Sequence, residues 1–113
     1  MEFINSLIFG QTKPILIINI VTGVVAWANP ASGILFECTC TELIGKHLAE
    51  LHPNDEHDYI LEQLQLVITD NYGKEKVAHI LTSTAKRKQV VITIANSFEI
   101  DKNRYIPICY KDS

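Results

Sequence analysis

The most constraining feature of this sequence is the stretch 29–55, which carries three sets of helix signals in close succession. Asn29 before Pro30 predicts a helix start, because asparagine can cap a free amide and proline tolerates the first helical position. In segment 41–45, two large apolar residues precede a glycine that can end a helix. In segment 48–51, two leucines lie three residues apart, which is helical spacing. Helices this short cannot form a bundle, so we expect them to lie as a belt on a sheet formed by the flanking segments.

Segments rich in β-branched residues flank the belt on both sides. Residues 15–21 predict a buried strand, and the Thr22-Gly23 turn joins it to a second strand over 24–28 as a hairpin. The longest helix is predicted over 54–71, where acidic residues crowd the first turn. Three further strands are predicted over 76–82, 89–98 and 104–111. This order of elements predicts an α+β fold, with helices on one face of an antiparallel sheet.

The first residues predict a separate short helix. Apolar side chains recur at helical spacing over residues 1–11, ahead of a core over 14–113, and the length of 113 residues suits one domain. The apolar face of this helix consists of Phe3, Ile4, Leu7 and Ile8. A helix of about two turns is not stable alone in water, so it must dock on a surface. It either covers its own sheet or joins two copies, and we predict a homodimer through this helix.

The charge and composition of the chain argue against several classes of partner. With a net charge of −3, the chain has no general basic field to hold nucleic acid or an anionic membrane. The longest apolar run is far too short to span a bilayer, and Glu2 with no early basic residue argues against a secretory signal. Three cysteines, an odd number, are typical of a reducing compartment. We therefore expect a cytoplasmic protein.

The sequence carries no signature of a catalyst. It has no glycine-rich phosphate loop, no nucleophile elbow and no His-Glu-x-x-His pair, and its four histidines match no zinc-ligand spacing. Cys38 and Cys40 have no basic neighbour closer than Lys46 to favour a thiolate, so packing is the simpler role and a redox role stays open. We therefore expect neither an enzyme nor a metal site.

The motifs of the belt, in this order and spacing, resemble the PAS family of sensor domains. The matching residues are Asn29, Ala31-Ser32, Leu35-Phe36, 42–46 and the His-Pro-Asn-Asp box at 52–55. We expect His52 in this box to fix the loop by hydrogen bonds. Glu37 replaces the family's usual glycine, so we expect the first belt helix to end without a left-handed residue. Ser113 replaces an apolar residue in the closing motif. The resemblance implies a five-stranded antiparallel sheet in the spatial order 2-1-5-4-3.

The resemblance also places the last strand at the centre of the sheet, although that strand contains Pro107. Proline has no N–H to donate to a ladder, and central strands rarely contain it. We predict a bulge or a missing backbone bond at Pro107, with pairing continuing on both sides.

The space between belt and sheet is the ligand site that the resemblance implies. We expect it to be lined by Phe36, Leu48, Leu64, His79, Ile92 and Asn96. His79 and Asn96 are polar residues on otherwise apolar predicted strands, and each needs a hydrogen-bonding partner if it faces inward. A ligand is one such partner, and an ordinary packed core is the alternative for all six residues.

Two cofactors found in the family are not expected in this chain. Haem-binding members carry a ligand histidine in the long helix, where this chain has His57, but Tyr59 comes one residue too early for their motif. Because acidic residues flank His57, we expect it to be exposed and to bind no haem. Flavin-bonding members need a cysteine on the third short helix, and residues 46–51 contain none, so we expect no flavin photoadduct.

The resemblance implies a regulatory sensor module that binds a small ligand or senses a cue. Such a module controls an output domain of the histidine kinase or diguanylate cyclase type. The alternative is an interaction-only module that has a filled core and serves to form dimers. A bound small molecule or an internal cavity distinguishes the first from the second.

Overall fold

The computed structural model describes residues 13–67 and 75–112, which form an antiparallel sheet and a helical layer. The strands are β1 (Ile15–Asn19), β2 (Val25–Ala28), β3 (Glu75–Leu81), β4 (Arg87–Ile94), β5 (Phe98–Ile100) and β6 (Asn103–Asp112). They lie in the order β2-β1-β6-β4-β3, and β5 pairs with β6. The predicted order of five strands is confirmed, and β5 is a sixth strand that was not predicted.

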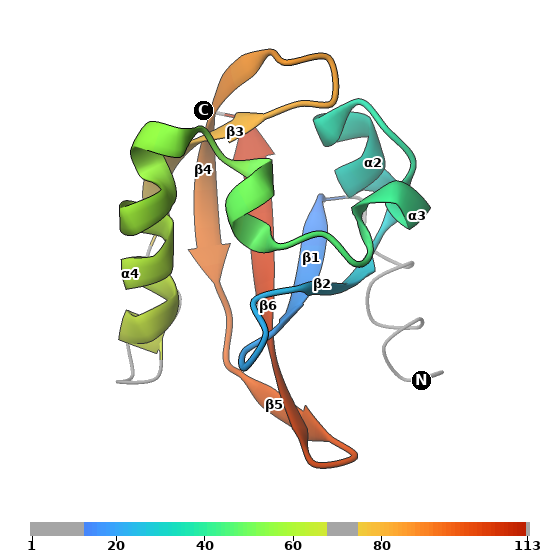
Figure 1. Cartoon of the computed structure of the whole chain (residues 1–113), viewed down its shortest axis with the longest axis vertical. Helices are drawn as coiled ribbons and strands as arrows, with labels where there is room; N and C mark the ends of the chain where they lie inside the picture. The colour runs from blue at the N-terminus through green and yellow to red at the C-terminus, as the bar shows by residue number, and fades with distance from the viewer. Residues whose placement is uncertain (1–12, 68–74, 113) are drawn as a thin grey trace.

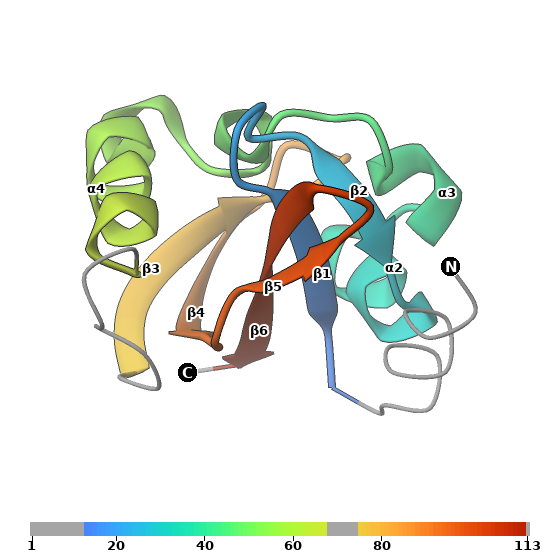
Figure 2. The ribbon, with the colours of Figure 1, turned by 90° about the horizontal axis from the view of Figure 1, so that it is seen from below.

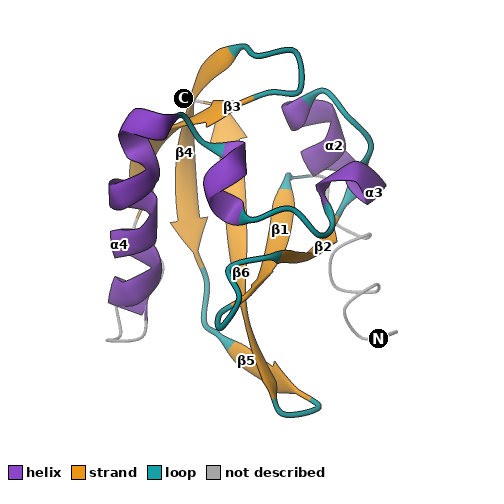
Figure 3. Ribbon diagram, viewed as in Figure 1, coloured by secondary structure: helices purple, strands orange, loops and turns teal. Residues whose placement is uncertain are grey.

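The helical layer covers one face of the sheet, as predicted for an α+β fold. It contains α2 (Pro30–Phe36), α3 (Cys40–Leu43), the 3₁₀ helices η1 (Leu48–Leu51) and η2 (Asn54–Glu56), and α4 (His57–Val67). Figures 1 and 3 show α4 beside the β3 side of the sheet and α2 and α3 on the β1–β2 side. Seen from below, the helices arch over the sheet (Figure 2). We call residues 30–56 the belt.

The belt begins at a buried cap. Asn29 is fully buried, and its side-chain oxygen accepts hydrogen bonds from the amides of Ser32 and Ile15, both at 3.0 Å. Its side-chain amide donates to the carbonyl of Lys13 at 2.7 Å. One side chain therefore caps α2 and fixes the start of β1. The helix start predicted at Asn29 is confirmed.

The end of α2 corrects an expectation. Glu37 adopts the left-handed conformation itself, with φ 60°, so the expectation that this helix ends without a left-handed residue is wrong. The connection between β3 and β4 holds Glu37 in place, because Ser83 donates to its carbonyl and Thr84 donates to its carboxylate at 2.7 Å. These contacts offset the cost of a left-handed side-chain-bearing residue, which is roughly 1–2 kcal/mol.

The pleat of the sheet separates two apolar clusters. Leu16 and Ile18 of β1 face the helices and join the main core, whereas Ile17 between them faces the opposite side. On that outer face, Ile17 and Tyr105 are buried among the half-buried residues Ile15, Ala26, Trp27, Phe98 and Ile100. The sheet is therefore apolar on both faces at the end formed by β1, β2, β5 and β6.

Pro107 interrupts pairing on one side of the central strand. Pairing between β4 and β6 ends at Ile94 opposite Ile108, and the amide of Ala95 then donates to the carbonyl of Pro107 at 3.0 Å. Proline has no N–H to return that bond, and pairing resumes only with β5, at Phe98 opposite Tyr105, after one extra residue. Pairing of β6 with β1 passes Pro107 unbroken. The predicted interruption is confirmed on the β4 side, and the strand predicted over 89–98 therefore ends at Ile94.

Some predictions fall outside the described residues. They include the amphipathic helix over 1–11 and the part of the long helix beyond Val67. Across the described residues, no helix combines the length and the apolar character needed to cross a membrane.

Candidate functional site

A buried histidine joins the belt to the sheet. His52 follows η1 and is only 2% exposed. Its Nδ1 lies 2.7 Å from the carbonyl oxygen of His79 on β3, and its Nε2 lies 3.2 Å from the hydroxyl of Tyr110 on β6. Because a carbonyl oxygen only accepts, Nδ1 of His52 donates to it, and the remaining Nε2 of the neutral ring accepts from Tyr110. The prediction that His52 fixes its loop by hydrogen bonds is confirmed.

Burial sets the charge state of this pair. Desolvation lowers the pKa of His52 to about 4, against the opposing effects of its bond to His79 and of the nearby carboxylate of Glu56. Burial also raises the pKa of Tyr110 well above its ordinary range. Both side chains are therefore neutral at physiological pH, as the direction of their hydrogen bond requires.

Glu56 is a second belt residue that bonds to His79 on β3. One carboxylate oxygen accepts the backbone amide of His79 at 2.7 Å, and the other lies 2.7 Å from Nδ1 of the His79 ring. His79 thus finds its hydrogen-bonding partner within the chain. Both backbone groups of His79 are satisfied by belt side chains, that is, by His52 and Glu56. We call His52, Glu56, His79 and Tyr110 the polar junction.

The polar junction continues to the protein surface. Arg87 at the start of β4 makes a two-bond contact with the carboxylate of Asp55, at 2.9 and 3.2 Å, and lies 3.9 Å from Glu56. The hydrogen bonds from Arg87 lower the pKa of Asp55. A continuous set of polar contacts therefore runs from the buried Tyr110 to the solvent.

His57 adjoins the polar junction and was predicted to be exposed. It is half-buried, and its Nε2 donates to the carbonyl of His52 at 3.0 Å, so the prediction of exposure is wrong. The side chain therefore bonds the loop that precedes α4, at the residue where the helix begins. Absence of haem at His57 stays a prediction. Among the described residues, no three His, Cys, Asp or Glu side chains gather as metal ligands.

The six predicted ligand-site residues are not all in one place. Phe36, Leu48 and Ile92 lie together in the main core, where the ring of Phe36 packs edge-on against Tyr110 at 5.6 Å. Asn96 is exposed in the connection after β4, so its inward placement is wrong: the strand ends at Ile94, because pairing stops opposite Pro107. Leu64 belongs to α4, and its side chain lies outside the described residues.

A small cavity lies beside Phe36, within the belt. It has a volume of about 70 Å³ and is lined by apolar belt residues, by Cys38, by the charged belt residues Lys46 and Glu50, and by Leu81, Thr82 and Ser83 at the end of β3. This is roughly twice the volume that one water molecule occupies in the liquid, so the cavity has room for a molecule of only a few atoms. Burial raises the pKa of the Cys38 thiol, so the cavity carries a protonated thiol.

The comparisons with known proteins agree on one fold. A family model described as PAS fold matches residues 2–108, and no curated protein matches the chain. A PAS domain from a two-component sensor histidine kinase superposes with a TM-score of 0.78 at 12% identity, covering 99% of this chain and 95% of that one. The PAS domain of a protein from Colwellia psychrerythraea gives 0.81 at 11% identity, covering 99% and 95%. A PAS domain in complex with ethanol, from a LuxR-family regulator of Burkholderia thailandensis, gives 0.76 at 14% identity, covering 96% and 95%.

Proposed function

The chain belongs to the PAS family of sensor domains, and we propose that it binds a small ligand and controls an output domain of the histidine kinase or diguanylate cyclase type. The domain itself acts as a sensory rather than a catalytic unit. A reducing, cytoplasmic setting is proposed with it, supported by three free cysteines.

The observation that carries the proposal is the polar junction. It connects the belt to the edge strand β3 through His52 and Glu56, and to the central strand β6 through Tyr110. Side-chain hydrogen bonds of this kind are either made or broken, so a cue that displaces the belt changes the contacts of both strands. Beyond Tyr110, strand β6 continues to Asp112, and this short path carries the change to the end of the sheet.

The cavity beside Phe36 supports a small ligand. Its volume of about 70 Å³ suits a molecule of a few heavy atoms, and its lining combines apolar side chains and hydroxyls with the opposite charges of Lys46 and Glu50, which suits a small polar molecule without net charge. The Burkholderia thailandensis relative was solved in complex with ethanol, a molecule of this size. A ligand in this cavity contacts Phe36, whose ring packs on Tyr110 of the polar junction.

Native mass spectrometry tests the ligand directly. Freshly purified protein is expected to carry an additional small mass that is lost under denaturing conditions. Cys38→Met should remove this mass, because the longer side chain fills the cavity that Cys38 lines. The matched control is Cys109→Met, since Cys109 is half-buried and lines none of this cavity. If the unmutated protein carries no additional mass, the interaction-only alternative is favoured.

The outer face of the sheet supports that alternative. Trp27, Phe98 and Ile100 remain half-buried around Ile17 and Tyr105, which gives this face the apolar character of a contact surface. We propose that the helix predicted over 1–11 forms a dimer here.

Leu7→Glu combined with Ile8→Glu is expected to convert a dimer into a folded monomer, because carboxylates are costly to bury in an apolar interface. Analytical ultracentrifugation at high micromolar concentration measures this change, with circular dichroism to confirm folding. Asn5→Glu with Ser6→Glu is the matched control on the opposite face of the predicted helix and should leave the dimer intact. A monomeric unmutated protein would contradict the proposal.

A further inference from the structure

A second hollow in the protein is separate from the cavity beside Phe36. It is a groove of about 440 Å³ at the end of the sheet where β1 begins and β6 ends, and it shares no lining residue with the cavity. Its volume falls within the range of roughly 300–1,000 Å³ typical of small-molecule sites. We propose that this groove binds an amphipathic carboxylate, a molecule with an apolar body and one anionic head group.

The floor of the groove suits an apolar body. It is formed by Pro14 before β1 and by Ala31, Ile34 and Leu35 of α2. Leu35 is buried, but Ile34 is 80% exposed, which is high for a large apolar side chain on a helix that otherwise packs on the sheet. An alkyl or aromatic group lying along α2 would remove Ile34 and the adjoining apolar surface from water, which is the main source of affinity in such grooves.

The rim of the groove suits an anion. Three lysines, Lys13, Lys88 and Lys111, line it against one carboxylate, Asp112, in a chain whose net charge is −3. Lys111 is already engaged, with its Nζ 2.7 Å from a carboxylate oxygen of Glu75. Within the described residues, no carboxylate lies within ion-pair distance of Lys13 or Lys88. These two ammonium groups are therefore the donors available to a carboxylate head group.

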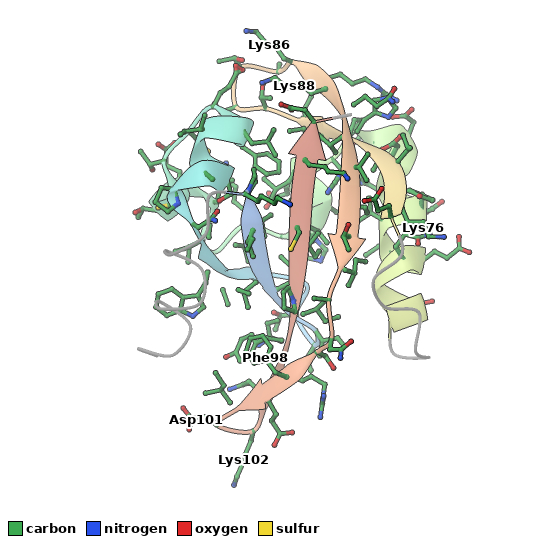
Figure 4. All side chains as sticks on the ribbon, turned by 180° about the vertical axis from the view of Figure 1, so that it is seen from behind. Lys76, Lys86, Lys88, Phe98, Asp101 and Lys102 are labelled. Carbon is green, nitrogen blue, oxygen red and sulfur yellow. The ribbon has the colours of Figure 1, made fainter. Side chains whose placement is uncertain are left out.

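The position of the groove connects it to the polar junction. Figure 4 shows Lys88 at the end of the sheet where β6 finishes, beside the helical layer. Tyr110 lines the groove and donates its hydroxyl to His52 inside the protein. A ligand in the groove thus contacts a residue of the polar junction directly. The groove is therefore a second ligand site in contact with the polar junction, in addition to the cavity beside Phe36 on which the proposed function depends.

Isothermal titration calorimetry with octanoate tests the proposal, with 1-octanol and octylamine as neutral and cationic probes of the same apolar length. Octanoate is expected to bind more tightly than either. Lys13→Gln with Lys88→Gln should weaken octanoate binding by about threefold or more, because each exposed charge pair contributes up to about fivefold in affinity. Lys102→Gln, at the far end of the molecule in Figure 4, is the control and should change nothing. Asp112→Asn removes the opposing carboxylate and should tighten binding.

A second variant tests the location. Ile34→Asp places a negative charge in the groove without disturbing the core and should abolish octanoate binding, whereas Val21→Asp, at a position 86% exposed and away from the groove, should not. Neither variant should remove a co-purified mass from the cavity beside Phe36, so the two proposals fail independently. Absence of octanoate binding, equal binding of octanol, or unchanged binding by Ile34→Asp would each overturn the groove as a carboxylate site.

Discussion

Replacing His52 with alanine is expected to lower the free energy of unfolding by about 4 kcal/mol. The substitution removes a ring that is only 2% exposed and leaves a void in the core. It also leaves the carbonyl of His79 and the hydroxyl of Tyr110 without partners, and each unpaired buried group costs about 1–3 kcal/mol. Chemical denaturation followed by circular dichroism measures the change.

His47→Ala is the matched control for His52→Ala. His47 is half-buried, and among the described residues its side chain makes one hydrogen bond, accepting from the amide of Ala49 at 3.1 Å, so its loss should cost only about 1 kcal/mol. Equal losses in the two variants would show that the polar junction does not stabilise the fold. If His52→Ala does not fold, Tyr110→Phe supplies a milder test, because it deletes only the donor to Nε2 of His52 and should cost about 1–2 kcal/mol.

Acid is expected to destabilise the protein through the same histidine. The pKa of His52 is about 4 in the folded protein and 6.5 ordinarily, so between these values the unfolded chain binds the additional proton. Stability contributed by neutral His52 is therefore complete above pH 6.5 and is lost as the pH falls toward 4. The shift corresponds to about 3 kcal/mol. The titratable side chains that act on His52 are Glu56 and His57, and Tyr110 stays neutral throughout.

A variant that does not titrate isolates this effect from the other acidic groups. In His52→Gln the side-chain amide supplies an NH₂ donor group and a carbonyl acceptor but takes up no proton in this range. The free energy of unfolding of the unmutated protein should fall by about 3 kcal/mol more than that of His52→Gln between neutral pH and pH 4. Parallel pH profiles for the two proteins would show that His52 does not govern acid unfolding.

The belt and most strands could be predicted because their signals act over a few residues. The cap at Asn29 depends only on Pro30 after it and a free amide nearby, and the structure contains this cap. The same reasoning fails for the polar junction, whose partners are remote in sequence: His52 lies 58 residues from Tyr110 and 27 from the carbonyl of His79. The motif around His52 indicated a bonding role, but nothing local indicated Tyr110.

The errors have the same origin. The β-branched run 90–94 favours a strand that continues through Asn96. The strand instead ends at Ile94, because Pro107 on another strand lacks the N–H to continue pairing. Glu37 was not expected to be left-handed because the residues that hold it there, Ser83 and Thr84, come from a distant turn. In both cases a contact made only in the folded chain overrides a local preference. The ligand-site role of Phe36, Leu48, Leu64, His79 and Ile92 stays a prediction.

The way the belt holds His79 also bears on self-assembly. An edge strand exposes amides and carbonyls that can pair with another chain, and long unprotected edges promote aggregation. At the β3 edge, Glu56 and His52 occupy the amide and carbonyl of His79. At the opposite edge, Val25 of β2 exchanges two 2.8 Å backbone bonds with Gly45 and Lys46 of the belt. The belt therefore occupies part of each edge, and any state in which it lifts from β3 opens a site for strand addition by a second chain, beside the exposed Val77.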